Sequence, residues 1–516
     1  MNTTDHKKID VKPIFEATNS KCPIQRLEIG PISLSLIAMG VDGFANIVTA
    51  PCATKIEDYV LQNYTAPKLP EEYLEVVFNE TPKTESVGNG HGQQKCSNIF
   101  FPYARSAVAM VSIASTQKLM TNNEAETQPQ ILQFVLNTAA SLPGVDFQPG
   151  DTVGILASNS EFEVDFVLRA TRLEADASAL CTVKLKSCCL KKSAKVPAHI
   201  PEVTTPREIL RDCLSLRAAP KKQFLRALAE CCSEPNERHF LCSLSSKEGA
   251  HFYNNLILEK GYTLVDFLAL CPTCCPSLAL LVEQLPRLLP RPYSIASSPL
   301  KNNAGEIKII FSVLPQRPGV VTGMLQCLSQ DLLRGGHPCV HLFFRETNKF
   351  RYSQDDACKG CIMIGVGTSV APFLGFLEHK QLLTAGDQKY SNRVGKTWLF
   401  SGSKSKSSAC ARKDFQEFKS RGILDAYFEA FSRVDDWPAK YVQDLLLANC
   451  EEFVDFFIGQ PETRLYVCAD GAKISKSIEA GIKQCLMQSL VVDETEATEL
   501  IKSFRNSGKY SEDLWT

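Results

Sequence analysis

The sequence predicts two folded parts in succession: an antiparallel β-barrel that carries a helical insertion, then an α/β domain built on a parallel sheet. Three observations predict this architecture. Short strand-like apolar runs occupy about residues 100–156 and return near residue 308. Helical periodicity dominates the stretch between them. From Cys361 onward strand and helix patterns alternate, which is typical of a parallel sheet with helices on both faces.

The barrel is expected within a domain that spans residues 96–357. A Pro149-Gly150-Asp151 turn leads into one of its strands. Its strands are expected at residues 107–113, 131–137, 152–156 and 308–313.

The helical insertion is expected over about residues 160–289. Periodicity is clearest at 207–232 and 261–289. Thr205 before Pro206, with Glu208 three residues after the threonine, is typical of a helix start.

The α/β domain is expected over residues 358–516. Its strands are expected at 362–364, 397–400, 426–431 and 464–468. Its helices are expected at 371–383, 411–420, 439–448 and 473–487. Residues 1–95 are expected to be an N-terminal segment that ends in a linker at about 81–95, and the run 32–48 has no assigned role.

Composition narrows the classes of function. A chain of 516 residues with a net charge of -1 is large enough for two or three domains, and its charge gives no reason to expect nucleic acid or an anionic membrane as partner. No run of 18 charge-free apolar residues predicts a membrane span. The N-terminus is polar and shows no apolar core of a secretory signal peptide. The 21 cysteines are therefore expected to be reduced thiols in a cytoplasmic protein.

Two pairs of cysteines have CxxC spacing, Cys271/Cys274 and Cys358/Cys361. Two such pairs are able to form a zinc site. Both lie among apolar segments, however, where a cysteine commonly packs as a small hydrophobic side chain. The sequence therefore favours packing, and no metal is expected.

The motif Arg291-Pro292-Tyr293-Ser294 is the first of an ordered series. Arginine neutralises a phosphate, tyrosine offers a flat face to a flavin ring, and serine bonds the flavin edge. The alternative is a strand that starts after a proline-rich turn.

Gly319-Val320-Val321-Thr322 follows at a predicted helix start. Backbone N–H groups at such a position bind a pyrophosphate. A plain N-cap is the alternative for Thr322.

A dinucleotide loop is predicted next. Gly365, Gly367 and Thr368 follow an apolar strand and precede a helix, the context in which glycines let the backbone approach phosphate. A tight strand-to-helix turn is the alternative.

Further candidates for nucleotide binding follow later strands, on the side where such sheets bind ligands. Ser432-Arg433 and Lys440-Tyr441-Val442-Gln443 combine two cations with hydroxyl and amide donors, which suits the 2′-phosphate of NADPH. The alternative is a solvated, charged helix start.

The C-terminal part holds the candidate catalytic groups. Cys468 ends a predicted strand, Asp470 follows it, and Asp513 lies near the end of the chain. Together with Ser294, Cys468 and Asp513 could steady charge during hydride transfer. Trp515 could stack on a flavin and would then have to move in each turnover. The alternatives are core packing for Cys468 and groove filling for Trp515.

In this order the motifs resemble the ferredoxin-NADP reductase-type half of the diflavin reductases. The runs 69–74, 197–201 and 216–228 resemble the linker and helical insertion of that family, so the resemblance covers about residues 69–516. It implies that Arg291–Ser294, Gly319–Thr322 and Trp515 hold FAD. It implies that residues 432, 433, 440, 441, 443 and 470 bind NADPH, and that Ser294, Cys468 and Asp513 assist hydride transfer.

The branch of the family that the chain most resembles reduces the cobalamin of methionine synthase by one electron. The resemblance therefore implies this reaction for the chain and methionine synthase as its partner. Two alternatives stay open. The acceptor could be a heme protein or a separate flavodoxin, or the chain could be a non-catalytic protein that binds methionine synthase.

The chain departs from the family pattern in four places. Ser369 stands where a glycine is usual, Ser403 lies in Gly-Ser-Lys where Gly-Cys-Arg is usual, and Ala469-Asp470 replaces Gly-Asp. The residues before 70 show no strand–helix alternation and no phosphate loop of the flavodoxin type. FMN is therefore not expected on this chain, and a separate FMN protein is a possible partner.

Overall fold

The computed structural model describes residues 55–79, 101, 103–119, 129–187, 189, 193–301, 305–314, 318–346, 349–386, 390, 393–471 and 473–515. The expected linker at 81–95 and the run 32–48 lie outside these residues. The chain divides into two compact units. Unit 1 comprises Met1–Gly90, Ala157–Pro290 and Gln316–Cys327, and unit 2 comprises His91–Leu156, Arg291–Pro315 and Leu328–Thr516. Helix α12 (Val320–Leu333) contributes residues to both.

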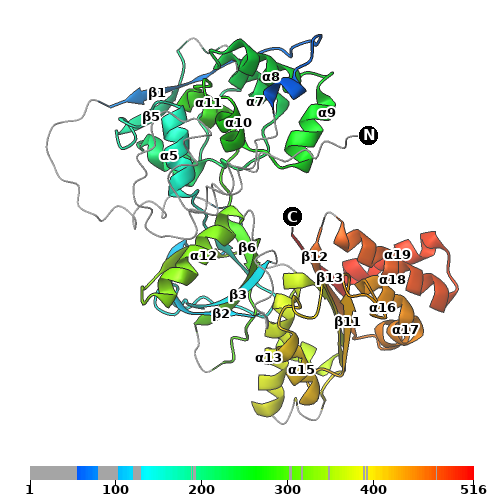
Figure 1. The fold of residues 1–516 in the computed structure, drawn as a ribbon. Helices are drawn as coiled ribbons and strands as arrows, with labels where there is room; N and C mark the ends of the chain where they lie inside the picture. Colours follow the sequence, from blue (N-terminus) through cyan, green and yellow to red (C-terminus); the bar gives the residue numbers. More distant parts are fainter. Residues whose placement is uncertain are drawn as a thin grey trace. The chain divides into compact units, whose positions relative to one another are not determined.

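Unit 1 holds the predicted helical insertion (Figure 1). Its helices are α5 (Glu161–Ala170), α6 (Pro206–Glu208), α7 (Lys222–Glu230), α8 (Pro235–Ser245), α9 (Ala250–Tyr253), α10 (Leu264–Leu270) and α11 (Leu278–Gln284). Strands β1 (Leu74–Phe78) and β5 (Cys181–Leu185) pair antiparallel beside them.

The helix start predicted at Thr205 is confirmed. The Thr205 side chain accepts from the backbone N–H of Glu208, whose carboxylate accepts from the backbone N–H of Thr205, and Pro206 occupies the first helical turn. This reciprocal pair satisfies two donors that the helix start would otherwise leave unbonded. The core of unit 1 is aromatic and aliphatic, with Phe224 and Phe240 almost fully buried.

The antiparallel sheet of unit 2 has six strands in the order β6-β4-β8-β2-β3-β7. They are β2 (Ala109–Lys118), β3 (Gln130–Asn137), β4 (Thr152–Ile155), β6 (Arg291–Ser294), β7 (Glu306–Val313) and β8 (Cys339–Phe344). An antiparallel bridge joins Ile295, just after β6, to Ile309 on β7. The first and last strands therefore meet, and the predicted barrel is confirmed.

The second sheet of unit 2 is parallel, as predicted, with five strands in the order β11-β10-β9-β12-β13. They are β9 (Cys361–Val366), β10 (Thr397–Ser403), β11 (Ala426–Phe431), β12 (Arg464–Asp470) and β13 (Tyr510–Trp515). Its helices are α13 (Ala371–Gly386), α15 (Arg412–Ser420), α16 (Val442–Ala448), α17 (Cys450–Gly459), α18 (Ile474–Leu490) and α19 (Glu494–Ser507).

Helices cover both faces of this sheet (Figure 1). Alternate residues of β9 point to opposite faces, as in any strand. Met363 packs in one core with residues of α13 and α15, whereas Ile364 packs in another with residues of α16, α17 and α18. The first core also contains Ile131 and Ile310 of the barrel, so barrel and sheet share buried apolar surface.

Strands β1 and β5 of unit 1 were not predicted, and neither were two strands of unit 2. β8 was not predicted, although five of the six residues in Cys339–Phe344 are apolar and only His341 interrupts the run. β13 was not predicted either, because Glu512 and Asp513 interrupt any apolar pattern. Pairing with β12 along its whole length orders this terminal segment.

Candidate active site at the carboxyl ends of β9 and β12

The strand order of the parallel sheet reverses at β9, because β10 lies on one side of it and β12 on the other. The crevice outside the carboxyl ends of such strands is the usual ligand site of an open α/β sheet. A ligand site is therefore expected at the residues that follow β9 and β12.

One glycine lies at the end of β9 and another in the loop that follows it, and the two have different tasks. A Cβ on Gly365 would lie 3.0 Å from the Phe373 ring and 3.1 Å from Val370, so a larger residue there needs these neighbours to shift by a few tenths of an ångström. Gly367 has φ +64°, a left-handed conformation that glycine adopts without strain. Thr368 follows in a short helical turn, Gly367–Val370, that leads into α13. The structure thus shows the tight turn, and phosphate binding by this loop stays a prediction.

The three candidate catalytic residues come together, although they are far apart in the sequence. In the parallel register of β12 and β13, Cys468 lies opposite Asp513. The hydroxyl of Ser294, at the end of barrel strand β6, donates to Asp513 Oδ2 at 3.0 Å. One residue from the barrel and two from the sheet therefore form a single polar cluster at the strand ends.

Burial controls the charge of this cluster. Burial raises the pKa of Asp513, while the hydroxyl of Ser294 and the positive charge of Arg345 act in the opposite direction. Burial also raises the pKa of Cys468, helped by the nearby Asp513 carboxylate, so Cys468 is a neutral thiol at neutral pH. The cluster offers a hydroxyl, a thiol and one carboxylate.

Trp515 borders the same cluster. Its indole N–H donates to Ser369 Oγ at 3.2 Å, and both Ser369 and Trp515 interact with the thiol of Cys468. The Trp515 side chain is 42% exposed, whereas Ser369 is buried. The serine that replaces the usual glycine thus gives the indole a polar anchor.

Strand β6 presents the residues expected to hold a flavin. Tyr293 pairs with Val153 of β4 and packs edge-on against Phe311, with ring centroids 6.3 Å apart. Burial raises the pKa of Tyr293, so its hydroxyl stays protonated. Arg291 is exposed at the start of the strand and Pro292 follows it. An exposed cation, a flat ring and the Ser294 hydroxyl on one strand suit the phosphate and ring of FAD.

Gly319, Val320, Val321 and Thr322 lie at the start of α12, in the part of the chain that belongs to unit 1. Thr322 Oγ1 donates to the carbonyl of Gly319 at 3.4 Å. Their predicted role toward a pyrophosphate stays a prediction.

The candidate NADPH residues lie beyond β10, β11 and β12. Backbone N–H groups of Ser432 and Arg433 donate to the carbonyls of Ser403 and Lys404, at 3.0 and 2.9 Å. The loop after β10 therefore runs beside the loop after β11. Asp470 ends β12, and its Oδ1 accepts from the backbone N–H of Lys473 at 3.4 Å.

Lys440 and Tyr441 precede α16, which begins at Val442 and not at Ala439 as predicted. Their backbone N–H groups both donate to the Asp444 carboxylate, at 3.0 and 2.8 Å, which caps the helix and leaves the two side chains exposed. Gln443 lies one residue into α16 and packs on Gly481.

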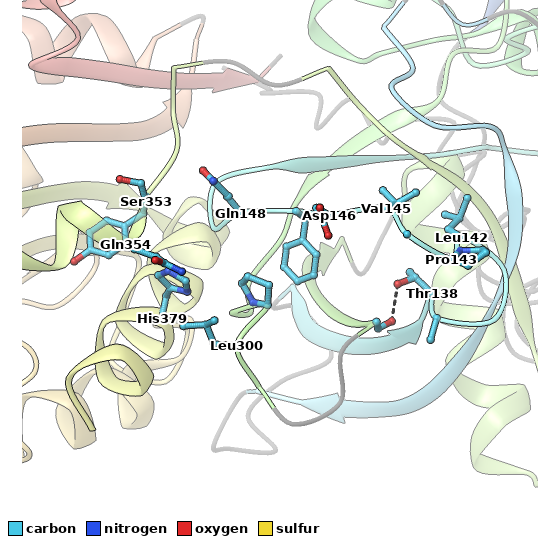
Figure 2. A pocket seen from close by; sticks show the side chains of 16 residues that line it. Thr138, Leu142, Pro143, Val145, Asp146, Gln148, Leu300, Ser353, Gln354 and His379 are labelled. Carbon is cyan, nitrogen blue, oxygen red and sulfur yellow. Dashed lines mark hydrogen bonds between the residues drawn. The ribbon is translucent and has the colours of Figure 1, made fainter. Parts of the chain in front are cut away.

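A separate pocket of about 620 Å³ lies in unit 2 between barrel loops and α13 (Figure 2). Its lining includes Thr138, Gln148, Leu300, Gln354 and His379, and it contains none of the predicted cofactor residues. Sequence patterns could not reveal it, because four separate segments form it.

His379 is a buried, neutral member of that lining. Its Nδ1 lies 2.9 Å from Ser298 Oγ, and burial lowers its pKa to about 4. It therefore carries no charge at neutral pH.

The cysteines and helices of the described part of the chain bear on the metal and membrane predictions. Its cysteines are all free thiols, and no group of three or more metal-binding side chains is arranged around a common point. Cys271 and Cys274 belong to unit 1, and Cys358 and Cys361 to unit 2. Among the described helices, none combines the length and the apolar character needed to span a bilayer.

The fold and the matched domain define a protein of the ferredoxin-NADP reductase fold with an FAD-binding domain. The family described as FAD binding domain matches residues 102–322, which include barrel strands β2, β3, β4, β6 and β7 and the helical insertion. The barrel and the parallel sheet complete the two-domain fold of this type.

The chain is also similar in sequence to individual proteins of known name. The chain is 32% identical to human methionine synthase reductase over 477 residues, which cover 87% of this chain and 65% of the human protein. It is 27% identical to methionine synthase reductase of Caenorhabditis elegans over 72% of this chain and 55% of that protein. It is 26% identical to a bifunctional cytochrome P450/NADPH–P450 reductase of Bacillus subtilis over 80% of this chain and 37% of that protein.

These similarities make the chain a homologue of methionine synthase reductases. The chain spans 65% of the length of the human relative. The matched part is the one that carries the FAD-binding domain. FAD is accordingly the cofactor that the matched domain is expected to bind.

Proposed function

We propose that this chain transfers electrons from NADPH through bound FAD, in the reductive reactivation of cobalamin-dependent methionine synthase. The observation that carries the electron-transfer part is the cluster of Ser294, Cys468 and Asp513 at the carboxyl ends of the sheet. The acceptor rests on similarity to methionine synthase reductases.

Some of the candidate site residues would hold FAD and NADPH, and others would stabilise charge during electron transfer. Arg291 and Tyr293 would hold the phosphate and ring of FAD, and Trp515 would cover the ring until nicotinamide displaces it. FAD, when bound, supplies the chemistry by accepting an electron pair and releasing electrons singly. Arg433 and Lys440 would bind the 2′-phosphate of NADPH.

The polar cluster has a defined electrostatic task. When a reduced nicotinamide gives up a hydride, its ring becomes positive. An ionised Asp513 beside it favours that change, and the Ser294 hydroxyl, by donating to Asp513, fixes the orientation of the carboxylate. Cys468 remains a thiol and fills the strand end as a neutral neighbour.

Flavin content and anaerobic reduction test this function. Purified protein should release FAD, and NADPH should bleach its flavin absorbance in the absence of oxygen. If the protein releases neither FAD nor FMN and binds no nucleotide, a non-catalytic binding protein is favoured. A flavin that NADPH leaves oxidised would indicate a degenerate reductase.

Selectivity tests the assignment of the phosphate site. Arg433→Ala should raise the KM for NADPH by about tenfold or more and leave the KM for NADH nearly unchanged, since one charge-assisted contact to phosphate is lost. Equal changes for both nucleotides would remove Arg433 from the 2′-phosphate site.

Transfer to the acceptor needs a separate assay. Reduced protein should restore the activity of oxidised methionine synthase, with a separate FMN protein added as electron carrier. Reduction of a heme protein or a flavodoxin, without any effect on methionine synthase, would assign another acceptor.

A further inference from the structure

Five cysteines gather in unit 1 where the end of helix α7 meets the loop that follows helix α10. The first segment holds Cys231 and Cys232, and the second is the run Cys-Pro-Thr-Cys-Cys over residues 271–275. All five are free thiols, and the candidate active site uses none of them. Three of them, Cys232, Cys271 and Cys274, are almost completely buried. Thiols on two segments are able to form a disulfide where their side chains approach each other closely.

Backbone and sulfur contacts set Cys232 beside Cys274. The N–H of Cys275 donates to the carbonyl of Cys231 at 3.0 Å, which brings the residue after Cys231 next to the residue before Cys275. These two residues are Cys232 and Cys274. Their Sγ atoms both lie 3.4 Å from the carbonyl oxygen of Leu228, and their side chains bond to each other. A disulfide needs an approach of this kind.

Thr273 holds the two segments in this position. Its Oγ1 accepts from the backbone N–H groups of Ser233 and Glu234, at 3.2 and 3.1 Å. Its hydroxyl donates in turn to Glu237 Oε2 on helix α8, at 2.5 Å. The loop after α10 is therefore fixed to the turn between α7 and α8, and a bond between the segments requires little backbone movement.

Cys232 is the thiol of this group that ionises most easily. Hydrogen bonds from Cys271 and Cys274 lower the pKa of Cys232, and the nearby positive charge of Arg238 acts in the same direction, although burial opposes them. The Arg238 guanidinium also donates to the carbonyl of Cys232 at 3.4 Å. The bonds to Cys232 raise the pKa of Cys271 and of Cys274. Because the thiolate is the reactive form of cysteine, Cys232 is the expected nucleophile.

Burial limits which oxidant reaches the pair. Cys232 is 2% exposed and Cys274 is 3% exposed, whereas Cys231 and Cys275 beside them are only partly buried. The pair therefore lies close to the surface under a thin cover of protein. Hydrogen peroxide is little larger than water, and it is the class of oxidant that such a site admits.

We propose that Cys232 and Cys274 are a redox-active pair that hydrogen peroxide converts into a disulfide, which ties the end of α7 to the loop after α10. The Cys232 thiolate attacks one peroxide oxygen, the O–O bond breaks, and the departing hydroxide takes up the proton that Cys232 released. The resulting sulfenic acid is attacked by the Cys274 sulfur, and its hydroxyl leaves as water with the proton of Cys274. The two thiols lose two electrons in total, and the peroxide becomes two molecules of water.

Disulfide mapping in the full chain tests the proposal. Reduced protein is treated with hydrogen peroxide, free thiols are blocked with N-ethylmaleimide in denaturant, and peptides are identified by mass spectrometry. The Cys232–Cys274 bond should form, and dithiothreitol should remove it. Cys358 and Cys361 are the internal control, because they have CxxC spacing and burial raises the pKa of Cys361. Their bond should be at least about tenfold less abundant.

Variants identify the partners. Cys232→Ser and Cys274→Ser should each abolish the bond. Cys231→Ala removes the adjacent, less buried cysteine and is the matched control, which should retain it. Cys271→Ala should also retain the Cys232–Cys274 bond, because Cys271 supplies only a hydrogen bond to the pair. Thermal unfolding shows which variants are folded, and the mapping of the wild-type chain depends on none of them.

Three results would overturn the proposal. The first is a wild-type chain in which peroxide leaves Cys232 reduced or carries it to a sulfinic acid without a disulfide. The second is a bond from Cys232 to Cys271 that persists in folded Cys274→Ser. The third is equal oxidation of the Cys358/Cys361 pair, which would mean that CxxC spacing, and not this arrangement, decides reactivity. Each leaves the proposed electron transfer untouched, because the assay involves neither FAD nor NADPH.

Discussion

Helix α13 meets the barrel through a glycine, and enlarging that residue should disturb both stability and electron transfer. A Cβ on Gly375 would lie 3.1 Å from the backbone N and O of Ser297 and 3.2 Å from the carbonyl oxygen of Ile295. Ordinary contacts of a Cβ begin near 3.4 Å. Gly375→Ala therefore requires the helix and the barrel strand to separate by a few tenths of an ångström.

The magnitude follows from two opposing terms. Overpacking costs about 1–3 kcal/mol, and the gain in helix propensity from glycine to alanine returns up to about 1 kcal/mol. The net destabilisation should be about 0–3 kcal/mol. A misplacement of about 1 Å between reacting groups can cost about 100-fold in rate, so about 0.3 Å should cost about fourfold.

Gly386→Ala is the matched control, because it lies at the end of the same helix with no atom within 4 Å of the added Cβ. Stopped-flow reduction of bound FAD by NADPH, with thermal unfolding of each variant, measures both effects. Gly386→Ala should be as fast and at least as stable as wild type. Equal rates and stabilities in the two variants would refute the close contact between α13 and the barrel.

Three further predictions concern charge and the indole. Asp513→Asn should slow FAD reduction by about 10- to 100-fold and abolish its decline toward low pH, because burial raises the pKa of Asp513 and its protonation removes the stabilising charge; an unchanged pH profile of the rate would contradict this role. Burial lowers the pKa of His379 from 6.5 to about 4, so unfolding free energy should fall by up to about 3 kcal/mol as pH drops across that window, and His379→Gln should flatten the slope in chemical denaturation series. Trp515→Ala should lower the NADPH-over-NADH ratio of kcat/KM by about tenfold, as steady-state kinetics would show, whereas a constant ratio would mean that Trp515 does not cover the flavin.

The regular elements were the most predictable part of the fold. Strand β11 (Ala426–Phe431) has the predicted bounds, and α13 begins at Ala371 as predicted. In these segments the spacing of apolar residues along the sequence matches the face of the element that is buried in the structure. The start of α16 was predicted three residues early, because an extended Tyr441 and the Asp444 cap set the boundary, and no apolar period does.

The arrangement of the candidate site was only partly accessible from sequence. Residue types near strand ends indicated Ser294, Cys468 and Asp513, but their contact depends on strand β13, whose polar sequence gives no strand signal. The register that sets Cys468 against Asp513 exists only once β13 pairs with β12. The bond from Trp515 to Ser369 likewise follows from this pairing, which brings the C-terminal strand to the loop after β9.

The most direct test of the account is a single anaerobic mixing experiment with the FAD-loaded chain. We expect NADPH to bleach the flavin rapidly and NADH to do so at least about tenfold more slowly at equal concentration. Asp513→Asn should slow the NADPH reaction without loss of bound FAD. A flavin that stays oxidised with NADPH, or a chain that binds no FAD, would contradict these expectations.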